Sequence, residues 1–347
     1  MSKKSIINRR GFLKSSAVTA GALAVAPLHF ACASSANPTV LTNRSNFGGV
    51  QIGAITYSFR SMPTDPGSVL LYAISCGLGS LEMMGDVAER YAGRPTAPNF
   101  GPQIRVAQGQ ELTPEQIRER DIQNAAREAY NEELRAWRLS TPMSKYEELG
   151  KIYREAGVNI HILKLQPNAN MTDAELDYVF NACKAIGAMG LTVEIGLPVA
   201  ERAAAFAAKH GKYLILHNHA QFANPDFEGY DAYLKYDNVR FNFDMGHYAG
   251  STGRDPREIV EKYHERIASI HIKDKTGPNS DPANTNRPWG QGETPLREFL
   301  LFIKSNAGKP GWPVHCDIEL EYEIPANSDA VIETRRCVDW ARNAILG

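Results

Sequence analysis

The chain has 347 residues, of which 43% are hydrophobic and 22% are charged. This composition is typical of a globular enzyme, and the length is ordinary for one α/β barrel with insertions. The formal net charge is −1 and no block of like charge is present, which argues against a nucleic-acid partner or an anionic lipid surface.

The first 36 residues differ from the rest of the chain. They carry Arg9 and Arg10 in "NRRGFLK", followed by a weakly apolar run over residues 17–26. This arrangement is typical of a signal peptide and resembles the twin-arginine export signal. The apolar run is too short to span a bilayer stably. A disordered basic N-terminus is the alternative interpretation.

Small residues follow the apolar run and indicate a cleavage site. Ala31-Cys32-Ala33 fits the small-x-small pattern, and we expect cleavage at about residues 33–36. Cys32 could instead carry a lipid, which would make the protein a lipoprotein. From the signal peptide we expect an exported, periplasmic protein. The twin-arginine route carries folded proteins, which suits a protein that loads a metal before export.

The rest of the chain has scattered cysteines and no Cys-x-x-Cys pair. They are Cys76, Cys183, Cys316 and Cys337. Isolated cysteines beside apolar residues are more often buried thiols than disulfides, and we expect buried thiols here.

Eight short apolar runs predict β-strands. They span 49–59, 79–84, 157–167, 190–196, 212–220, 238–247, 267–275 and 312–321, and each ends in polar residues. Segments with helical spacing lie between them, such as "DAELDYVFNACKAIGAMG", which begins with acidic residues and stops at glycine. This alternation predicts parallel βαβ units, and eight units predict a closed (β/α)8 TIM barrel of the α/β class.

Two segments interrupt the barrel rhythm. Residues 90–141 contain a loop rich in Pro, Gly and Asn and then a charged helix, with Thr113 as its expected N-cap and Pro114 in its first turn. We expect this insertion after the second strand to be a mostly solvated helix that leans over the barrel mouth. Residues 274–296 form a long loop after the seventh strand. Residues 37–347 are thus expected to form one barrel domain.

Polar residues at the ends of the fifth to eighth predicted strands carry the chemistry. They are His217 in "LHNH", Asp244 and His247 in "DMGH", His271 and Lys273 in "HIKD", and Glu319 in "IELE". His217, Asp244 and His271 are each 27 residues apart, which is one βα unit. Equivalent positions on successive barrel strands converge on one axis, so we expect these side chains to share one volume.

Imidazole nitrogen and carboxylate oxygen are suitable ligands for a divalent transition metal such as Mn²⁺, Co²⁺, Zn²⁺ or Fe²⁺. Four unpaired ionisable groups in a buried mouth would be costly without a cation. The sequence therefore predicts one divalent metal ion held by four ligands, namely His217, Asp244, His271 and Glu319. The alternative is that each of them is a separately hydrogen-bonded polar residue.

The ordered set "LHNH", "DMGH", "HIKD" and "IELE" resembles the xylose isomerase-like barrel superfamily. This sugar phosphate isomerase/epimerase group also includes the endonuclease IV fold. The resemblance covers about residues 48–347 and depends on the order of the motifs, since no single one is decisive. It implies three metal ligands, Asp244, His271 and Glu319. It also implies that His247 lies near the substrate or a second metal position and Lys273 near a substrate oxygen.

One position departs from the family pattern. Epimerases of this group commonly have Glu where the fifth strand here ends in His217. Imidazole can replace the carboxylate as a ligand, but the site then carries one less negative charge. Glu194, at the end of the fourth strand, could supply a compensating carboxylate. The sequence leaves open whether His217 or Glu194 completes the metal shell.

Other polar and aromatic residues are weaker site candidates. Lys164 ends the third strand and either faces the pocket or pairs with Glu194. Glu82 is expected to bind a sugar hydroxyl or Lys164. His219 is expected to contact substrate or to support a ligand. Trp289 lies in the long loop and either stacks on a sugar ring or anchors the loop.

A divalent metal beside two sugar oxygens acidifies the C–H bond between them and stabilises the enediolate that forms when a base removes the proton. Return of the proton to the other face gives an epimer, and return to the next carbon gives an isomer. The sequence therefore predicts a metal-dependent carbohydrate isomerase or epimerase. Its proton-transfer residues are expected among Glu194, Lys273, His247 and Lys164.

Three alternatives remain open from the sequence. A 3-keto-glycoside lyase would use the same metal site for β-elimination, and exported relatives with a long inserted helix resemble such enzymes. A non-catalytic carbohydrate-binding protein would not require acid and base residues. A nuclease like endonuclease IV would require a basic DNA face. The expected partner is a small-molecule carbohydrate, with no nucleic acid and no stable membrane insertion. The sequence does not decide whether the chain forms a homo-oligomer.

Overall fold

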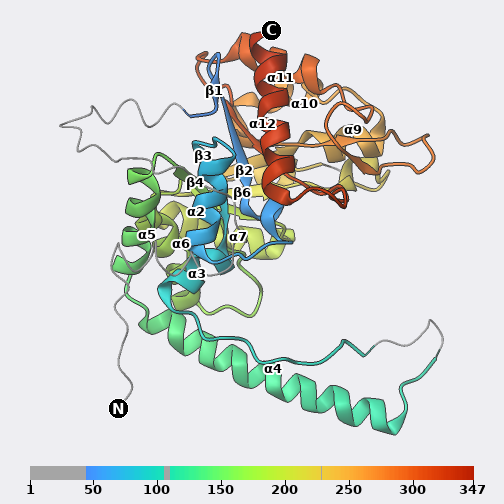
Figure 1. Ribbon diagram of the computed structural model, residues 1–347. Coiled ribbons are helices and arrows are strands. Elements are labelled where there is room, and N and C mark those ends of the chain that lie inside the picture. The colour runs from blue at the N-terminus through green and yellow to red at the C-terminus, as the bar shows by residue number, and fades with distance from the viewer. Residues whose placement is uncertain (1–43, 105–109, 228) are drawn as a thin grey trace.

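The computed structural model describes residues 44–104, 110–227 and 229–347. Strands lie at the centre of the molecule and helices surround them (Figure 1). The expected signal peptide, residues 1–36 with Cys32, lies outside the described residues.

Eight parallel strands close into a barrel. They are β2 (Val50–Ile55), β3 (Ser80–Met84), β4 (Asn159–Lys164), β5 (Gly190–Val193), β6 (Tyr213–His217), β7 (Val239–Asp244), β8 (Ile267–Ile272) and β11 (His315–Ile318). Each strand pairs with the next along the chain, and pairing of β2 with both β3 and β11 closes the ring. The predicted (β/α)8 TIM barrel is confirmed, and the short strand β1 (Asn46–Phe47) adds to β2 in antiparallel orientation.

Helices cover the outside of the barrel (Figure 1). They are α2 (Pro66–Ser75), α3 (Gly85–Ala92), α5 (Ser144–Glu155), α6 (Asp173–Ile186), α7 (Leu197–Lys209), α8 (Asp231–Leu234), α9 (Met245–Thr252), α10 (Arg257–Tyr263), α11 (Leu296–Asn306) and α12 (Ala330–Leu346). Short 3-10 turns are η2 (Thr56–Phe59), η3 (Ala220–Ala223) and η4 (His264–Arg266). Local chemistry sets their ends. Thr172 and Glu175 form a capping box at the start of α6, and Gly187 ends it with φ of 95°, a conformation that favours glycine.

The barrel interior is polar, in contrast to the apolar face that the strands turn toward the helices. His271 of β8 contacts Glu82 of β3, and His161 of β4 contacts Asp317 of β11. Since neither pair of strands is adjacent in the barrel, these side chains meet across its centre. Gly53 of β2 makes room for them, because a Cβ at that position would lie 2.1 Å from Asp317 Oδ1.

The predicted insertion contains one long helix, α4 (Pro114–Ser140). Thr113 caps it as predicted, with its hydroxyl accepting a hydrogen bond from the backbone N–H of Gln116 at 3.2 Å. Within α4 the buried residues are Tyr130 and Leu134, so the prediction of a mostly solvated helix is confirmed.

The C-terminal half of α4 is attached to the helical layer. Arg138 Nε lies 2.8 Å from Glu89 Oε1 of α3, and Arg135 Nε lies 3.1 Å from Glu175 Oε2 in the first turn of α6. Since α3 and α6 follow the carboxyl ends of β3 and β4, these contacts anchor α4 beside the barrel mouth. Its N-terminal half extends away from the barrel (Figure 1). The expected position over the mouth stays a prediction.

The long loop after β8 is more ordered than its composition suggests. It contains a small antiparallel ladder of β9 (Asp274–Lys275) and β10 (Asn286–Arg287). The Asp274 carboxylate accepts hydrogen bonds from the backbone N–H groups of Gly290, Gly292 and Thr294 at 2.8, 2.9 and 3.2 Å. One buried carboxylate thus organises the loop beside the mouth.

The cysteines of the described ranges agree with the expectation of buried thiols. Cys76, Cys183, Cys316 and Cys337 are all buried and free. None of the helices in the described part of the chain has the length and apolar character needed to cross a membrane.

Candidate metal centre

The four predicted ligands meet at the carboxyl end of the barrel. His217 ends β6, Asp244 ends β7, His271 lies near the end of β8, and Glu319 follows β11. Strand register sets their common height, since Asp244 pairs with His271. Their ligand atoms all lie within 4.8 Å of one another, and all four residues are buried.

The chemistry of this group fits a divalent cation. His217 Nδ1 is buried without a hydrogen-bond partner among the described residues, and the buried Asp244 Oδ2 has the ammonium of Lys273 at 2.9 Å. Metal bonds of about 2.0–2.3 Å place neighbouring donors roughly 3–4.5 Å apart, which is close to the spacing here. Two imidazoles and two carboxylates suit Zn²⁺, Mn²⁺, Co²⁺ or Fe²⁺. The structure places His217 in this group and Glu194 outside it.

Carboxylates hold His271 on both sides of its ring. Nδ1 lies 2.9 Å from Glu319 Oε2, and Nε2 lies 2.8 Å from Glu82 Oε2. Asn242 Nδ2 donates to the same Glu82 oxygen at 2.8 Å. Burial alone would lower the pKa of His271, but the two carboxylates raise it well above its ordinary value. The contact of Glu82 with Nε2 fixes the orientation of the His271 ring, as carboxylate partners of ligating histidines do.

The ammonium of Lys273 lies among the same carboxylates. Nζ is 2.9 Å from Asp244 Oδ2, 2.8 Å from Glu319 Oε2 and 2.6 Å from Glu321 Oε2. It also lies 3.1 Å from His247 Nε2. Burial acts to lower the pKa of Lys273, but the carboxylates, Asp244 foremost, raise it above its ordinary value. The lysine is therefore charged and balances the carboxylates.

The Asp-x-x-His spacing has a local structural cause. Asp244 is the N-cap of α9, and its Oδ1 accepts the backbone N–H of His247 at 2.6 Å. Its other oxygen, Oδ2, faces the centre. Asn218 fixes the backbone, because its Oδ1 accepts the Asp244 N–H at 2.9 Å and its Nδ2 donates to the Asp244 carbonyl at 3.1 Å. The cap thus orients Asp244 and places His247 one turn further on.

A second polar group lies at the mouth and consists of Glu194, Lys164 and His219. The Lys164 ammonium pairs with Glu194 Oε1, and His219 Nε2 lies 3.2 Å from Glu194 Oε2. His219 and Lys164 lower the pKa of Glu194 to about 2. Glu194 in turn raises the pKa of His219. The pairing of Lys164 with Glu194 is one of the two arrangements that the sequence allowed.

His247 lies between these two groups. Its ring centroid is 4.9 Å from that of His219 and 6.3 Å from that of His217. One nitrogen from each of these three histidines lies within 4.8 Å of the others. Burial lowers the pKa of His247 to about 4, so that its imidazole is neutral near pH 7. The geometry is compatible with the expected place of His247 beside a substrate or a second cation.

Two of the predicted substrate-binding residues have partners inside the protein. Glu82 is fully buried, and its Oε2 contacts His271 Nε2 and accepts a hydrogen bond from Asn242, so it supports the ring of a predicted ligand. Trp289 packs edge to face on Trp340 of α12, with centroids 5.7 Å apart, and anchors the long loop. The contact of Trp289 agrees with the loop-anchor alternative, and binding of a sugar hydroxyl by Glu82 stays a prediction.

The sequence interpretation missed a polar layer beneath the ligands. His161 Nε2 lies 2.9 Å from Asp317 Oδ2, and Ser269 Oγ donates to the same oxygen at 2.5 Å. Asp317 and Ser269 precede Glu319 and His271 by two residues, so they face the same side of their strands. The layer ties β4, β8 and β11 together below the centre. Period-two alternation of polar residues on these strands is the signal that could have revealed it.

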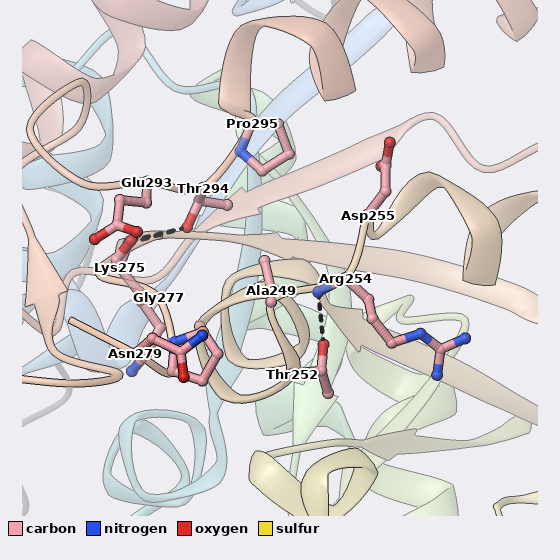
Figure 2. A pocket seen from close by; sticks show the side chains of 13 residues that line it. Ala249, Thr252, Arg254, Asp255, Lys275, Gly277, Asn279, Glu293, Thr294 and Pro295 are labelled. Carbon is pink, nitrogen blue, oxygen red and sulfur yellow. Dashed lines mark hydrogen bonds between the residues drawn. The ribbon is translucent and has the colours of Figure 1, made fainter.

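A separate cavity of about 540 Å³ lies beside α9. Figure 2 shows Lys275, Glu293 and Thr294 on one side of it and Arg254 and Asp255 on the other. None of the predicted site residues lines this cavity. Its charged groups are of both signs, and the cavity is separate from the group of predicted ligands.

Comparison with known proteins agrees with this geometry. Residues 197–340 match the family model described as xylose isomerase-like TIM barrel. The matched region contains all four predicted ligands. No curated protein matches the sequence significantly.

Several solved structures share the fold. A xylose isomerase domain protein from Alicyclobacillus acidocaldarius is 14% identical, with a TM-score of 0.55 over 85% of this chain and 100% of that one. The probable 3-DHS dehydratase of petrobactin synthesis from Bacillus anthracis is 12% identical, with a TM-score of 0.52 over 83% and 97%. A sugar phosphate isomerase/epimerase from Parabacteroides distasonis is 15% identical, with a TM-score of 0.51 over 84% and 95%. At these identities the likeness shows the fold alone.

Proposed function

We propose that this chain, a barrel of the xylose isomerase-like type, is a metal-dependent enzyme that isomerises or epimerises a sugar or keto-sugar. One observation carries the proposal. Four ligand-type side chains from successive strands converge within 4.8 Å in the buried mouth of the barrel. A protein described as a sugar phosphate isomerase/epimerase has the same fold, which supports the assignment to sugar chemistry.

His217, Asp244, His271 and Glu319 would hold one divalent ion, Mn²⁺, Co²⁺, Zn²⁺ or Fe²⁺. Such an ion, when bound, polarises substrate oxygens and so acidifies the neighbouring C–H bond. His217 is suited to this role, because burial lowers its pKa well below the ordinary value and leaves a neutral imidazole. The strand ends hold the donor side chains close to one another.

The proton-transfer residues are proposed on both flanks of the mouth. On one flank Glu194 contacts Lys164 and His219 and raises the pKa of both, which favours the protonated forms that can donate a proton to a sugar oxygen. On the other flank lies His247 with Lys273. Groups on two sides allow a proton to leave one face of a carbon and return to the other face or to the next carbon.

The charge pairing of the mouth favours an uncharged substrate. Lys164 is paired with Glu194, and Lys273 is paired with Asp244, Glu319 and Glu321. Neither lysine is left unpaired for a phosphate group. We therefore propose a neutral sugar or keto-sugar in preference to a sugar phosphate.

Elimination at the same centre is the second candidate. A 3-keto-glycoside lyase requires removal of a proton next to a carbonyl and protonation of a leaving oxygen on the β-carbon. Lys164 and His219, both held by Glu194, offer such a proton donor. A protein described as a probable dehydratase, which is also a C–O eliminating enzyme, shares the fold.

The experiment that tests the proposal is a substrate panel in deuterated water. The full chain is stripped of metal, reloaded with Mn²⁺, Co²⁺, Zn²⁺ or Fe²⁺, and mixed with sugars, keto-sugars and glycosides. NMR should show exchange of one C–H, together with an epimer, an isomer or cleavage of a glycoside. The wild type should contain about one metal ion per chain. Asp244→Asn is the control and should lose both the metal ion and the C–H exchange.

Each outcome of the panel separates the candidate functions. Exchange with a new epimer or isomer supports the main proposal, and release of the glycosidic group supports the lyase. A metal-loaded protein that binds a sugar and exchanges no proton would be a carbohydrate-binding protein. A folded wild-type protein with no metal would contradict the metal-dependent reading.

A further inference from the structure

The carboxylates of the candidate centre already have a cation among them, the ammonium of Lys273. We propose that Lys273 is a built-in counter-cation that a divalent ion has to displace, so that this lysine sets the metal affinity of the site. This inference rests on the metal-dependent function proposed above. It concerns the loading of the centre and adds a role to Lys273 beyond its expected contact with a substrate oxygen.

The oxygens that Lys273 contacts belong to the two predicted carboxylate ligands. Its Nζ lies 2.9 Å from Asp244 Oδ2 and 2.8 Å from Glu319 Oε2. Asp244 and Glu319 would be among the residues that hold a divalent ion, through the same carboxylate groups. The ammonium and the metal ion would then share one small volume, where like charges repel strongly. The two cations therefore exclude each other.

Glu321 would keep the displaced ammonium next to the centre. Glu321 Oε2 is 2.6 Å from Lys273 Nζ, and its side chain is 23% exposed, compared with 7% for Glu319. Glu321 is thus on the solvent side of the centre. A lysine has a flexible stem and can keep its contact with Glu321 while it leaves Asp244 and Glu319.

Gly246 of α9 determines the path of the lysine stem. A Cβ at this position would lie 2.3 Å from Lys273 Cγ and 2.5 Å from the Lys273 carbonyl oxygen. The helix therefore packs its glycine directly against the lysine. This close approach directs the ammonium into the centre and leaves only the end of the side chain free to move.

The test compares metal binding by the full chain and by Lys273→Met. Both proteins are stripped with EDTA and titrated with Zn²⁺ or Mn²⁺ in competition with a chromophoric chelator. We expect Lys273→Met to bind the ion at least ~10-fold more tightly, because the competing charge is gone. Lys273→Gln, which keeps a hydrogen-bond donor for Asp244, replaces it where the methionine variant does not fold without metal.

Lys275→Met is the matched control. This substitution removes the same charge two residues away from Lys273. In the structure Lys275 Nζ donates a hydrogen bond to Asn286 Oδ1 at 3.0 Å. We expect its removal to change the affinity by less than ~3-fold, since it makes no contact with the ligand carboxylates. An equal gain in both variants would reduce the effect to net charge and overturn the role of Lys273.

A double-mutant cycle tests the role of Glu321. Glu321→Gln should weaken metal binding ~3-fold or more in the wild-type background, because the displaced ammonium loses its partner. In the Lys273→Met background the same change should have no effect. Weakening in both backgrounds would mean that Glu321 acts on the metal through space, which contradicts the displacement.

The binding data also separate this inference from the proposed function. Equal or weaker binding by Lys273→Met, in a protein whose wild type binds metal, overturns only the role of Lys273. Failure of every protein in the set to bind any of the ions overturns the metal-dependent function, and the inference falls with it.

Discussion

At the scale of single residues, His217 departs from the pattern of the barrel superfamily that the sequence resembles, in which epimerases commonly have Glu at this position. The sequence left open whether Glu194 supplies the missing negative charge. In the structure Glu194 is paired with Lys164 and His219 and lies outside the ligand group. The buried carboxylate next to the ligands is Glu82, whose Oε2 lies 2.8 Å from His271 Nε2. Glu82 therefore places a buried negative charge next to His271.

The role of Glu82 leads to a prediction for metal affinity. Glu82→Gln should weaken metal binding ~10- to 100-fold, because His271 loses the carboxylate that orients its ring. Isothermal titration with Zn²⁺ measures the change. Glu89→Gln is the matched control, because Glu89 is equally buried but pairs with Arg138 of α4. It should lose stability and keep its metal affinity. Unchanged affinity in Glu82→Gln would show that Glu82 does not position the ligand.

At the scale of elements, the inserted helix α4 is held by few contacts. Within α4 the buried residues are Tyr130 and Leu134, and ion pairs of Arg135 and Arg138 attach its C-terminal half. The Glu89 partner of Arg138 is almost fully buried, whereas the pair of Arg120 with Asp121 is exposed. The attachment of the helix therefore depends on its C-terminal half.

Removal of the Arg138 side chain should detach α4. Arg138→Ala leaves the Glu89 charge buried with one partner fewer, which should reduce the free energy of unfolding by about 3 kcal/mol. Urea denaturation measures this loss, and limited proteolysis should show faster cleavage in the helix. Arg120→Ala, on the exposed half, should change stability by less than about 0.5 kcal/mol. Equal effects of the two substitutions would rule out a dominant anchor at Arg138.

The polar layer below the centre links strands β4, β8 and β11 and makes stability depend on pH. Burial acts to raise the pKa of Asp317, but His161 lowers it from 3.8 to about 2. For a lowered carboxyl pKa, the stabilisation is present above the ordinary value and is lost as the pH falls through the folded value. The pKa of His161 is raised by Asp317 against the effect of burial. Its contribution is present below the ordinary value of 6.5 and is lost as the pH rises through the raised value.

The difference between two proteins tests this linkage. From pH 4 to pH 2, metal-free wild type should lose about 2 kcal/mol more stability than Asp317→Asn, because the variant has no carboxyl to protonate at this site. Chemical denaturation at each pH gives the two curves. Asp177→Asn, which removes a carboxylate near the surface that pairs with Lys209, should leave most of the acid dependence in place. Parallel curves for wild type and Asp317→Asn would contradict the assignment.

At the scale of the whole molecule, one barrel carries the candidate centre and the surrounding loops shape its mouth. The expected export of this barrel depends on residues 1–36, which lie outside the described part of the chain. We propose twin-arginine export, since that route accepts a folded protein and this centre is complete only after β6, β7, β8 and β11 have assembled.

Export is tested by substitution of the arginine pair. Replacement of Arg9 and Arg10 by lysine should retain the protein in the cytoplasm in its uncleaved form, because the twin-arginine route recognises that pair. Cell fractionation and the mass of the N-terminal fragment report the outcome. Periplasmic protein from the lysine variant would point to a different export route, and lipid on Cys32 would be visible as added mass.

Local patterns were sufficient for the fold. All eight strands, the capping of α4 by Thr113 and the convergence of the four ligands could be predicted, because strand periodicity, helix caps and the barrel repeat are properties of short segments. The partners of individual side chains were less predictable. Glu82 was predicted to bind a sugar hydroxyl or Lys164, and Trp289 to stack on a sugar ring or to anchor the loop. In the structure Glu82 contacts His271 and Trp289 packs on Trp340, both on distant elements.

The residue order thus contains the barrel and the spacing of the ligands, and it predicts an export signal, because each of these depends on contiguous segments. The pairing of charges became visible only in three dimensions. Glu82, His161, Lys273 and Asp317 find partners on strands that are up to 189 residues away. A buried charge is stabilised by whichever group the closed barrel brings next to it, and sequence distance carries no information about that. For this reason the ammonium of Lys273 among the ligand carboxylates could be recognised only in the folded chain.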